Sequence, residues 1–379
     1  MLKFPSCFRA LQPCDQLLIL ILFGNVFYIA YYMNTSVSTS NTVPELPMAT
    51  DFISDAEIAE SYALLETQSH ELKVSRDSNH LKLCPSDPPS LLGDLACDCD
   101  PVSPEYLIST HPQMELGGRL RPNDCRALER TAIIIPFRDR FDHLYTLLKM
   151  ILPLLVRQQL DVTFFVIEQT EPILFNRAAL HNIGYLEALK VDNFDCFIFH
   201  DVDLIPLNDH NLYRCHDYPQ HFASTIKFGM FIPVTQMSDT YVGGVIAFKR
   251  HQYEFINGNS NLYFGWGGED EDLYQRIVNK NLAIVRAKKT VTRYHMLLHE
   301  RHEVTQDNLK RRWEILKTAT QRQGVEGLST TKYMMIENTQ HRLYTRIKVS
   351  LNMVEVFKTA PVSTLRDLRR AMLEKRAQT

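Results

Sequence analysis

The chain has 379 residues, of which 45% are hydrophobic and 22% charged, so it can form a large core with extensions. Its formal net charge is -3. Such a charge gives no electrostatic reason to expect a nucleic acid as the partner.

An apolar stretch lies close to the N-terminus. Residues 17–33, LLILILFGNVFYIAYYM, are apolar except for Asn25 and follow a tail that carries Lys3 and Arg9. At about 1.5 Å per residue this stretch can span a thin bilayer, and the basic tail favours a cytoplasmic N-terminus. A cleaved signal peptide is the alternative, but no small-residue cleavage site follows. We expect residues 1–16 to be a cytoplasmic tail and residues 17–33 an uncleaved type II anchor in the thin membrane of the Golgi.

A polar segment separates this anchor from the rest of the chain. Residues 34–82 are rich in Ser, Thr, Asp and Glu, which is typical of a lumenal stem. The sequon Asn34-Thr35-Ser36 lies so close to the span that its use stays open.

Eight cysteines divide between the two sides of the membrane. Cys7 and Cys14 are expected to be cytosolic, as free thiols or palmitoylation sites. An even lumenal set in an oxidising compartment favours disulfides over zinc, although the pairing does not follow from the spacing. The lumenal set is Cys84, Cys97, Cys99, Cys125, Cys196 and Cys215.

Strand-like and helix-like segments then alternate. TAIIIPF, DVTFFVIEQ and DCFIFHDVDLIP are short apolar runs, and HLYTLLKMILPLLVRQQ and NRAALHNIGYLEALK have helical length and spacing, with a kink expected at Pro153. This alternation predicts a largely parallel, doubly wound α/β sheet. Ligands of such sheets bind outside the carboxyl ends of the strands.

An acidic pair follows the third apolar run at that edge. On an extended chain Asp201 and Asp203 face the same side while Val202 points into the core. Paired carboxylates at a strand end can hold a divalent cation that bridges a diphosphate. A solvated strand end is the alternative.

Further potential metal ligands lie in YHMLLHERH. This segment holds His295, His299 and His302 together with Met296. Methionine is usually a filler of core gaps and a poor ligand, so by itself Met296 is interpreted as core. The density of imidazoles nevertheless indicates a metal site as the alternative to a structural role.

The stretch GWGGEDEDL joins four glycine and tryptophan residues to four acidic ones. The glycine-rich part, GWGG, does not favour a helix, whereas the acidic run is typical of a first helical turn. The dipole of a helix explains Asp270 and Asp272 but neither Trp266 nor the glycines. Something is therefore expected to approach this backbone closely.

Six segments, in this order and spacing, resemble the β-1,4-galactosyltransferase family of type II Golgi enzymes. They are IIIPFRDR, FNRAALHNIGY, FHDVDLIPLNDHNLYRC, YVGGVIAF, GWGGEDEDLYQRIV and HMLLHERH. The resemblance covers the expected catalytic domain, residues 83–352, and leaves residues 353–379 as a C-terminal extension. It implies a GT-A fold, Mn²⁺, a UDP-sugar donor and transfer with inversion, usually to a terminal GlcNAc.

The resemblance also implies roles for individual residues. Asp203, Met296 and His299 match the metal ligands, which replaces the interpretation of Met296 as core. Asp270 matches the catalytic base, and Glu269, Glu271 and Trp266 match residues that position the sugars, with Glu271 where Asp is commoner. The residues implied in binding the UDP-sugar are Pro136, Phe137, Arg138, Arg140, Phe175, Arg177, Asp201, Val202, Asp203, Tyr241 and Gly244. Those implied in binding the acceptor are Trp266, Gly267, Gly268, Glu269, Asp270, Arg312, Trp313 and Leu316.

Disulfide pairing follows from the same resemblance. Cys84 and Cys125 match one disulfide of the family, and Cys196 and Cys215 match the other. The family pattern does not include Cys97 and Cys99, whose state stays open.

Substrate choice admits alternatives. Tyr241 is expected beside C2 of the donor sugar, where a large aromatic hydroxyl goes with UDP-galactose and a smaller residue with UDP-GalNAc, unless it only anchors a sheet edge. TYVGG resembles the branch that galactosylates xylose, but Gly268 stands where that branch has Arg. Trp313 stands where Phe is more usual, and a helix core stripe is its other interpretation. Galactose transfer to GlcNAc is the first expectation, GalNAc transfer and a lumenal lectin or scaffold are the rivals, and a modifier protein or homodimer is possible.

Overall fold

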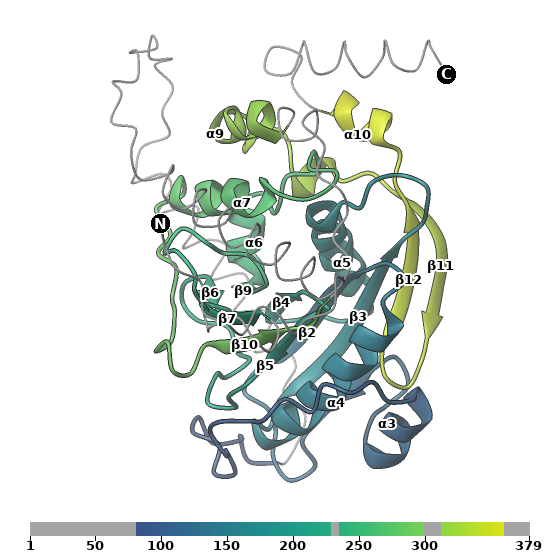
Figure 1. Ribbon diagram of the computed structural model, residues 1–379, viewed down its shortest axis with the longest axis vertical. Helices are drawn as coiled ribbons and strands as arrows, with labels where there is room; N and C mark the ends of the chain where they lie inside the picture. Colours follow the sequence, from purple (N-terminus) through teal and green to yellow (C-terminus); the bar gives the residue numbers. More distant parts are fainter. Residues whose placement is uncertain (1–80, 229–234, 299–311, 360–379) are drawn as a thin grey trace, which may run out of the picture. The chain divides into compact units, whose positions relative to one another are not determined.

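The computed structural model describes residues 81–228, 235–298 and 312–359. Its main sheet has the order β11-β12-β3-β2-β4-β9-β6, and β1 pairs with β3 (Figure 1). The central strands are parallel: β12 (Thr345–Ser350), β3 (Asp161–Gln169), β2 (Arg130–Phe137) and β4 (Cys196–His200). The margins pair antiparallel: β11 (Met334–Gln340), β9 (Val245–Lys249), β6 (Gln220–His221) and β1 (Arg119–Leu120).

The predicted sheet is therefore right at its centre and wrong at its margins. β2 and β3 are buried over almost their whole length, as expected of parallel strands covered on both faces. β11 and β12 form a hairpin joined by a short turn, which can only be antiparallel. The expectation of a largely parallel sheet rested on the alternating segments alone, and these do not include the hairpin.

Two helices cover opposite faces of the sheet centre. α4 (Phe141–Arg157) packs in one core cluster with Ile133 and Ile135 of β2, whereas α5 (Arg177–Val191) packs in the other with Ile134. Successive strand residues point to opposite faces, so one strand contributes to both cores. α4 continues through Pro153 to Arg157, and the predicted helix is present.

A smaller sheet lies beside the main one, with the order β5-β10-β7-β8. β10 (Arg293–Met296) is antiparallel to β5 (Leu204–Pro206) and parallel to β7 (Thr225–Phe228). β8 (Thr235–Gln236) completes this sheet. Because β5 follows β4 after only three residues, the chain passes from one sheet to the other at Asp201–Asp203.

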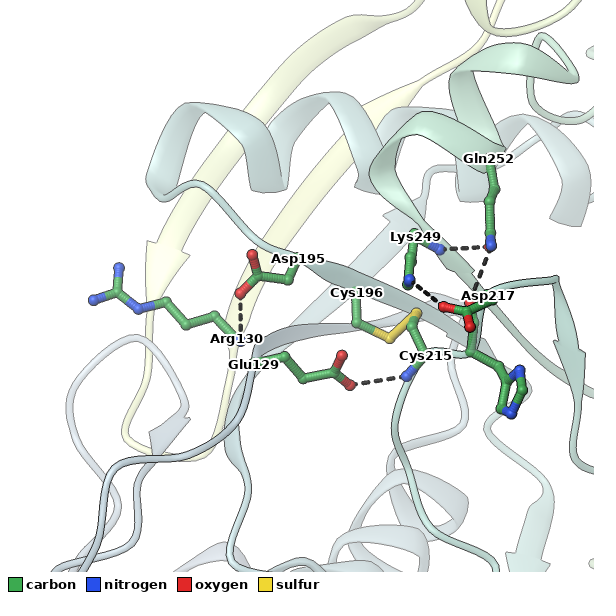
Figure 2. Close-up of a disulfide and its surroundings, with 9 residues drawn as sticks. Glu129, Arg130, Asp195, Cys196, Cys215, Asp217, Lys249 and Gln252 are labelled. Carbon is green, nitrogen blue, oxygen red and sulfur yellow. Dashed lines mark hydrogen bonds and ion pairs between the residues drawn. A yellow bond between two sulfur atoms is a disulfide. The ribbon is translucent and has the colours of Figure 1, made fainter. Parts of the chain in front are cut away.

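Two of the disulfides match the predicted pairs, Cys84–Cys125 and Cys196–Cys215. Figure 2 shows the second, at the start of β4. The amide of Cys215 donates to Glu129 Oε1 at 2.8 Å, and Lys249 Nζ lies 2.8 Å from Asp217 Oδ1. The disulfide thus holds the loop after β5 against the start of β4, an inner strand of the main sheet.

A buried ion network holds α7 (Glu269–Val278) in place. Asp272 accepts hydrogen bonds from Arg276 Nε at 2.6 Å and Arg322 Nη2 at 2.9 Å. Glu326 Oε2 accepts from Arg276 Nη2 at 3.0 Å and Arg322 Nη1 at 2.5 Å. All four side chains are 0% exposed. The network joins α7 to α9 (Ala319–Arg322) and to the loop that follows it.

The remaining helices pack around this core. α3 (Pro104–Thr110) begins after the N-cap Ser103, and α6 (Arg250–Phe255) follows β9 directly. α10 (Met353–Lys358) lies beyond residue 352, and its Val356 and Phe357 are buried in the second core cluster. The folded part of the chain therefore includes at least this helix.

The predicted anchor and stem lie outside the described residues, as does most of the predicted C-terminal extension. Within residues 81–228, 235–298 and 312–359, no helix is both long and apolar enough to cross a membrane.

Replacing Arg322 by methionine should lower the free energy of unfolding by about 3–5 kcal/mol, because the substitution leaves two buried carboxylates with one cation. Urea denaturation measures this change. Arg121→Met is the matched control, since Arg121 pairs with Glu115 at the surface, with side chains 48% and 41% exposed. It should cost less than about 1 kcal/mol. Equal losses in the two variants would contradict the importance of the buried network.

Candidate functional site

The segment Asp201–Asp203 is a turn, and the expectation of an extended segment is wrong. The amide of Leu204 donates to the carbonyl of Asp201 at 3.3 Å, because the chain bends here between the two sheets. Val202 is 4% exposed and points into the core, as predicted. Asp201 and Asp203 directly follow β4, so both lie at the carboxyl end of the central strands. Each carboxylate accepts a hydrogen bond from a different arginine.

Arg177, the first residue of α5, connects the two acidic segments. Its Nε donates to Asp201 Oδ1 at 2.5 Å, and its Nη1 donates to Asp270 Oδ1 at 2.7 Å. Glu269 Oε1 lies 3.7 Å from the same Nη1. The sequence predicted Arg177 as a contact of the nucleotide. In the structure it joins the turn after β4 to the start of α7.

The loop after β2 contributes two further arginines. Arg140 Nη1 donates to Asp203 Oδ2 at 3.1 Å. Arg138 donates to the carbonyls of Gln169 and Thr170, both at 3.2 Å, and its guanidinium lies 5.5 Å from the ring centre of Phe175. Pro136 and Phe137, at the end of β2, are buried. Of these residues, predicted to contact the nucleotide, Arg140 contacts the Asp201–Asp203 turn, whereas Arg138 and Phe175 lie together near the end of β3.

The glycines before α7 have backbone angles that other residues rarely adopt. Gly265, Gly267 and Gly268 have φ values of 89°, 97° and 94°. A Cβ on Gly267 would lie 2.3 Å from Arg312 Nη1, and one on Gly268 would lie 2.7 Å from a ring carbon of Tyr263. The close approach expected from the sequence is thus made by side chains of the protein itself.

Trp266 is presented to solvent by this backbone, with 67% of its surface exposed. The Arg312 guanidinium lies 5.4 Å from its ring centre and donates to its carbonyl at 3.2 Å. Trp313 is 44% exposed beside the same guanidinium. The exposure of Trp313 argues against a helix core stripe, and Leu316 is half-buried.

Two carboxyl groups in the first turn of α7, those of Glu269 and Glu271, have raised pKa values. Glu269 is largely buried. Its burial, and to a lesser degree the negative charge of Asp270, raise the pKa of Glu269 to about 8. Among the residues that the structure describes, its Oε2 has no hydrogen-bond partner. Burial raises the pKa of Glu271 as well. Near neutral pH Glu269 therefore retains its proton.

Asp201 also has a shifted pKa. Burial raises it to about 6, while the charge of Arg177 acts in the opposite direction.

The Gly243-Gly244 pair lies directly against Asp270. A Cβ on Gly243 would stand 2.2 Å from Asp270 Oδ2 and 2.8 Å from a ring carbon of Tyr241. Tyr241 lies in the loop before β9 and not on a strand. Its ring packs edge-on against His221, with ring centres 5.5 Å apart. Burial and the charge of Asp270 raise the pKa of Tyr241 well above its usual range.

Asp203 and Met296 are neighbours through the small sheet. The amide of Leu297 donates to the carbonyl of Asp203 at 2.8 Å, and Met296 pairs with Leu204. Met296 is half-buried, whereas Asp203 is 8% exposed. His299 and His302 lie outside the described residues. A carboxylate and a thioether together are a mixed donor set that fits a transition metal better than Mg²⁺ or Ca²⁺.

Three contributors to this site were missed in the sequence. Asp272 was explained by the helix dipole alone, but it belongs to the buried ion network. His221 Nε2 donates to the carbonyl of Gly243 at 2.9 Å, and the His221 ring packs against that of Tyr241. Gly243 admits Asp270. Only the pattern of acidic residues and the glycine pair gave any indication of these contacts.

Comparisons with known proteins show which family the sequence resembles. Residues 84–216 match the N-terminal region of glycosyl transferase group 7, and residues 232–300 match the family described as the N-terminal domain of galactosyltransferase. The chain is 38% identical to β-1,4-galactosyltransferase 4 of Mus musculus over 318 residues, 82% of this chain and 90% of that protein. It is 47% identical to a β-N-acetyl-D-glucosaminide β-1,4-N-acetylglucosaminyl-transferase of Lymnaea stagnalis over 220 residues, 57% of this chain and 44% of that protein.

A solved structure is similar as well. A mutant of Drosophila β-1,4-galactosyltransferase 7, in complex with manganese, UDP-Gal and xylobiose, matches with a TM-score of 0.51 and 28% identity. The match covers 59% of this chain and 95% of that one. It confirms the predicted glycosyltransferase fold of the GT-A class. The chain belongs to the β-1,4-galactosyltransferase family.

Proposed function

We propose that this protein transfers galactose from UDP-galactose, with inversion and in β-1,4 linkage, to a terminal GlcNAc of a glycoprotein or glycolipid. The observation that carries the proposal is the position of Asp270. Its carboxylate lies between Arg177 and the Gly243-Gly244 pair and follows directly on the glycine backbone that presents Trp266. One acidic group thus meets both the donor segment and the acceptor segment implied by the family.

The metal in this proposal is Mn²⁺, held by Asp203, Met296 and His299. The proximity of Asp203 and Met296 across the small sheet supports the first two ligands. When bound, Mn²⁺ supplies positive charge that stabilises the diphosphate of UDP as a leaving group. Arg138 and Arg140 lie in the adjacent loop, and guanidinium groups suit phosphate oxygens and the edge of uracil.

Asp270 is the proposed general base. It takes the proton from the acceptor hydroxyl as the oxygen attacks the anomeric carbon, and the bond from that carbon to the UDP oxygen breaks on the opposite face. Arg177 holds the carboxylate in place through a 2.7 Å hydrogen bond. Glu269, whose raised pKa keeps it protonated near neutral pH, is suited to hydrogen-bonding a sugar hydroxyl rather than to removing a proton. Glu271 is proposed to position hydroxyls too.

Tyr241 is proposed to select the donor. Its ring lies beside the Gly243-Gly244 pair and close to Asp270, so it is near the reacting groups. A large ring beside C2 of the sugar leaves room for a hydroxyl but crowds an N-acetyl group. Trp266, Arg312, Trp313 and Leu316 are proposed to surround the acceptor. Two exposed indole rings beside the same guanidinium form a surface suited to a sugar.

The predicted membrane topology completes the proposal. Residues 17–33 would anchor the protein in the Golgi membrane, with residues 34–82 as the stem and the catalytic domain in the lumen. UDP-sugar and glycan acceptor would then meet in the compartment where the family acts.

The purified protein, supplied with Mn²⁺, UDP-galactose and a GlcNAc-terminated acceptor, should form a β-1,4-linked galactoside, and EDTA should abolish the product until Mn²⁺ is returned. UDP-GalNAc, UDP-GlcNAc and acceptors ending in xylose or glucose complete the panel. Linkage is read by NMR. Full activity in excess EDTA, or a clear preference for UDP-GalNAc or UDP-GlcNAc, would contradict the proposal.

Tyr241→Leu should raise the use of UDP-GalNAc relative to UDP-galactose, because the smaller side chain leaves room for an N-acetyl group. An unchanged ratio of the two donors would remove Tyr241 from the donor pocket.

Asp270→Asn should lower kcat by about 10²- to 10⁴-fold, the usual contribution of a general base. The binding of UDP-galactose, measured by calorimetry, should change little because the base acts on the acceptor. Asp239→Asn is a control, since Asp239 is an exposed aspartate of the same region. Unchanged turnover in Asp270→Asn would move the base to another carboxylate.

The pH dependence of stability should reveal the buried proton of Glu269. Its pKa in the folded protein lies above its ordinary value of 4.5, at about 8. The stabilisation from this proton is therefore complete below about pH 4 and is lost as pH rises towards 8. Between about pH 5 and 8 the Tm of the native protein should fall relative to that of Glu269→Gln, whose amide cannot ionise.

Asp94→Asn is the control for that measurement. A hydrogen bond from Arg293 lowers the pKa of Asp94, so its charge is the same in both states over this range. The difference in Tm for this variant should be flat. A flat difference for Glu269→Gln as well would mean that Glu269 is ionised in the folded protein.

A further inference from the structure

A third disulfide joins Cys97 and Cys99, which are only two residues apart, with a Cα–Cα distance of 5.3 Å. The other two bridges span sequence separations of 41 and 19 residues. The constraint that a disulfide places on the unfolded chain grows with the length of the loop it closes. The Cys97–Cys99 bridge closes the shortest of these three loops. It is therefore expected to stabilise the fold less than either of the other two bridges.

An imidazole from a distant part of the sequence meets the two sulfurs. The Sγ atoms of Cys97 and Cys99 and a ring nitrogen of His295 all lie within 4.8 Å of one another. His295 is on β10, and neighbouring strand residues point to opposite faces. It therefore faces away from the side of Tyr294 and Met296, so this cluster is distinct from the proposed Mn²⁺ ligands.

The segment that carries the cysteines is held against β10. Asp94 forms an ion pair with Arg293, two residues before His295 on the same face of the strand. At the other end, Lys149 Nζ of α4 lies 2.6 Å from Asp98 Oδ2. These contacts do not use the sulfur atoms, so they would keep the two cysteines near His295 when the disulfide is open.

All three side chains are half-buried, and thus reachable by small reagents. Two of the disulfides are less accessible, since Cys84 is 3%, Cys125 8% and Cys196 0% exposed. Two thiolates and an imidazole are ligands typical of Zn²⁺ in proteins, and a three-ligand set leaves one tetrahedral position open.

We propose that reduction of the Cys97–Cys99 disulfide by a dithiol creates a Zn²⁺ site formed by Cys97 Sγ, Cys99 Sγ and a ring nitrogen of His295. In the reduction, the dithiol gives two electrons and two protons to the bridge and becomes a disulfide itself. Each cysteine then loses its proton to solvent as its sulfur binds the metal. The site does not depend on the proposed transferase activity, and the disulfide and the bound metal exclude one another.

Cobalt binding tests the proposal on the purified full-length protein. The protein is reduced mildly with dithiothreitol, separated from it without air, and titrated with Co²⁺, which replaces Zn²⁺ and has absorption bands specific for thiolate ligands. The reduced protein should show thiolate-to-cobalt charge-transfer absorption that saturates at one ion per chain and disappears when Zn²⁺ is added. The unreduced protein should not show it, although Co²⁺ bound elsewhere is allowed.

Variants assign the ligands. The double variant Cys97→Ser/Cys99→Ser should lose the charge-transfer band, which also excludes Cys7, Cys14 and the other disulfides as its source. His295→Ala should weaken Co²⁺ binding by about 10-fold or more, the scale on which losing a ligand or its support acts. His111→Ala, which removes a half-buried histidine elsewhere, should leave the titration unchanged.

Thermal unfolding of each variant checks that the fold is retained. A reduced native protein without the charge-transfer band would overturn the proposal. So would a band that persists in the double cysteine variant, or an affinity that His295→Ala leaves unchanged.

Discussion

The buried ion network around Asp272 is the interaction on which the site depends. Two carboxylates and two guanidiniums, all fully buried, join α7 to the chain that follows α9. Burying four charges is costly unless each finds its partners, and here every charge has at least two. The segment before the glycines is tied in as well, since the amide of Asn261 donates to Glu326 at 2.7 Å. Both ends of the glycine run are thereby fixed.

The direction of α7 follows from that anchoring. Asp272 and Arg276 are four residues apart and share the buried face of the helix. Asp270 lies on a different face because helical residues two positions apart, such as Asp270 and Asp272, point about 200° apart. The same acidic run can therefore serve two purposes. One carboxylate secures the helix inside the protein while another faces Arg177 and the Gly243-Gly244 pair.

Charge balance within the site has chemical consequences. Arg177 is within 4 Å of three carboxylates, those of Asp201, Glu269 and Asp270. One guanidinium cannot compensate three negative charges in a buried place, so the least solvated carboxylate retains a proton. This is Glu269, whose pKa is raised to about 8. The same shortage of positive charge makes the neighbouring turn a favourable place for a cation, which is consistent with the proposed ligand Asp203.

Glycine determines what can approach the reacting groups. Gly243 and Gly267 are positions where a Cβ would collide with Asp270 and Arg312 respectively. Gly243 and Gly267 belong to different segments, and each makes room for a charged side chain from another part of the chain. Their effect is to let charged groups converge on backbone that other residues would cover.

The sequence by itself determined the local elements and the identity of the chemical groups. The apolar runs of β2 and β3 and the helical segment of α5 appear within a residue or two of the predicted bounds, because hydrophobic periodicity is a local property. The six motifs identified the family, and they placed the disulfides of Cys84 and Cys196 with their partners.

Only the tertiary structure decided which of these groups meet. The Asp201–Asp203 segment bends because the chain passes there from one sheet to the other, and no local pattern encodes the second sheet. Arg177 bridges acidic groups 24 and 93 residues away in sequence, and Arg322 reaches Asp272 across 50. Cys97 and Cys99 meet His295 in the same way. Contacts over such separations arise from the packing of the sheets and helices as a whole, which residue spacing along the chain does not record.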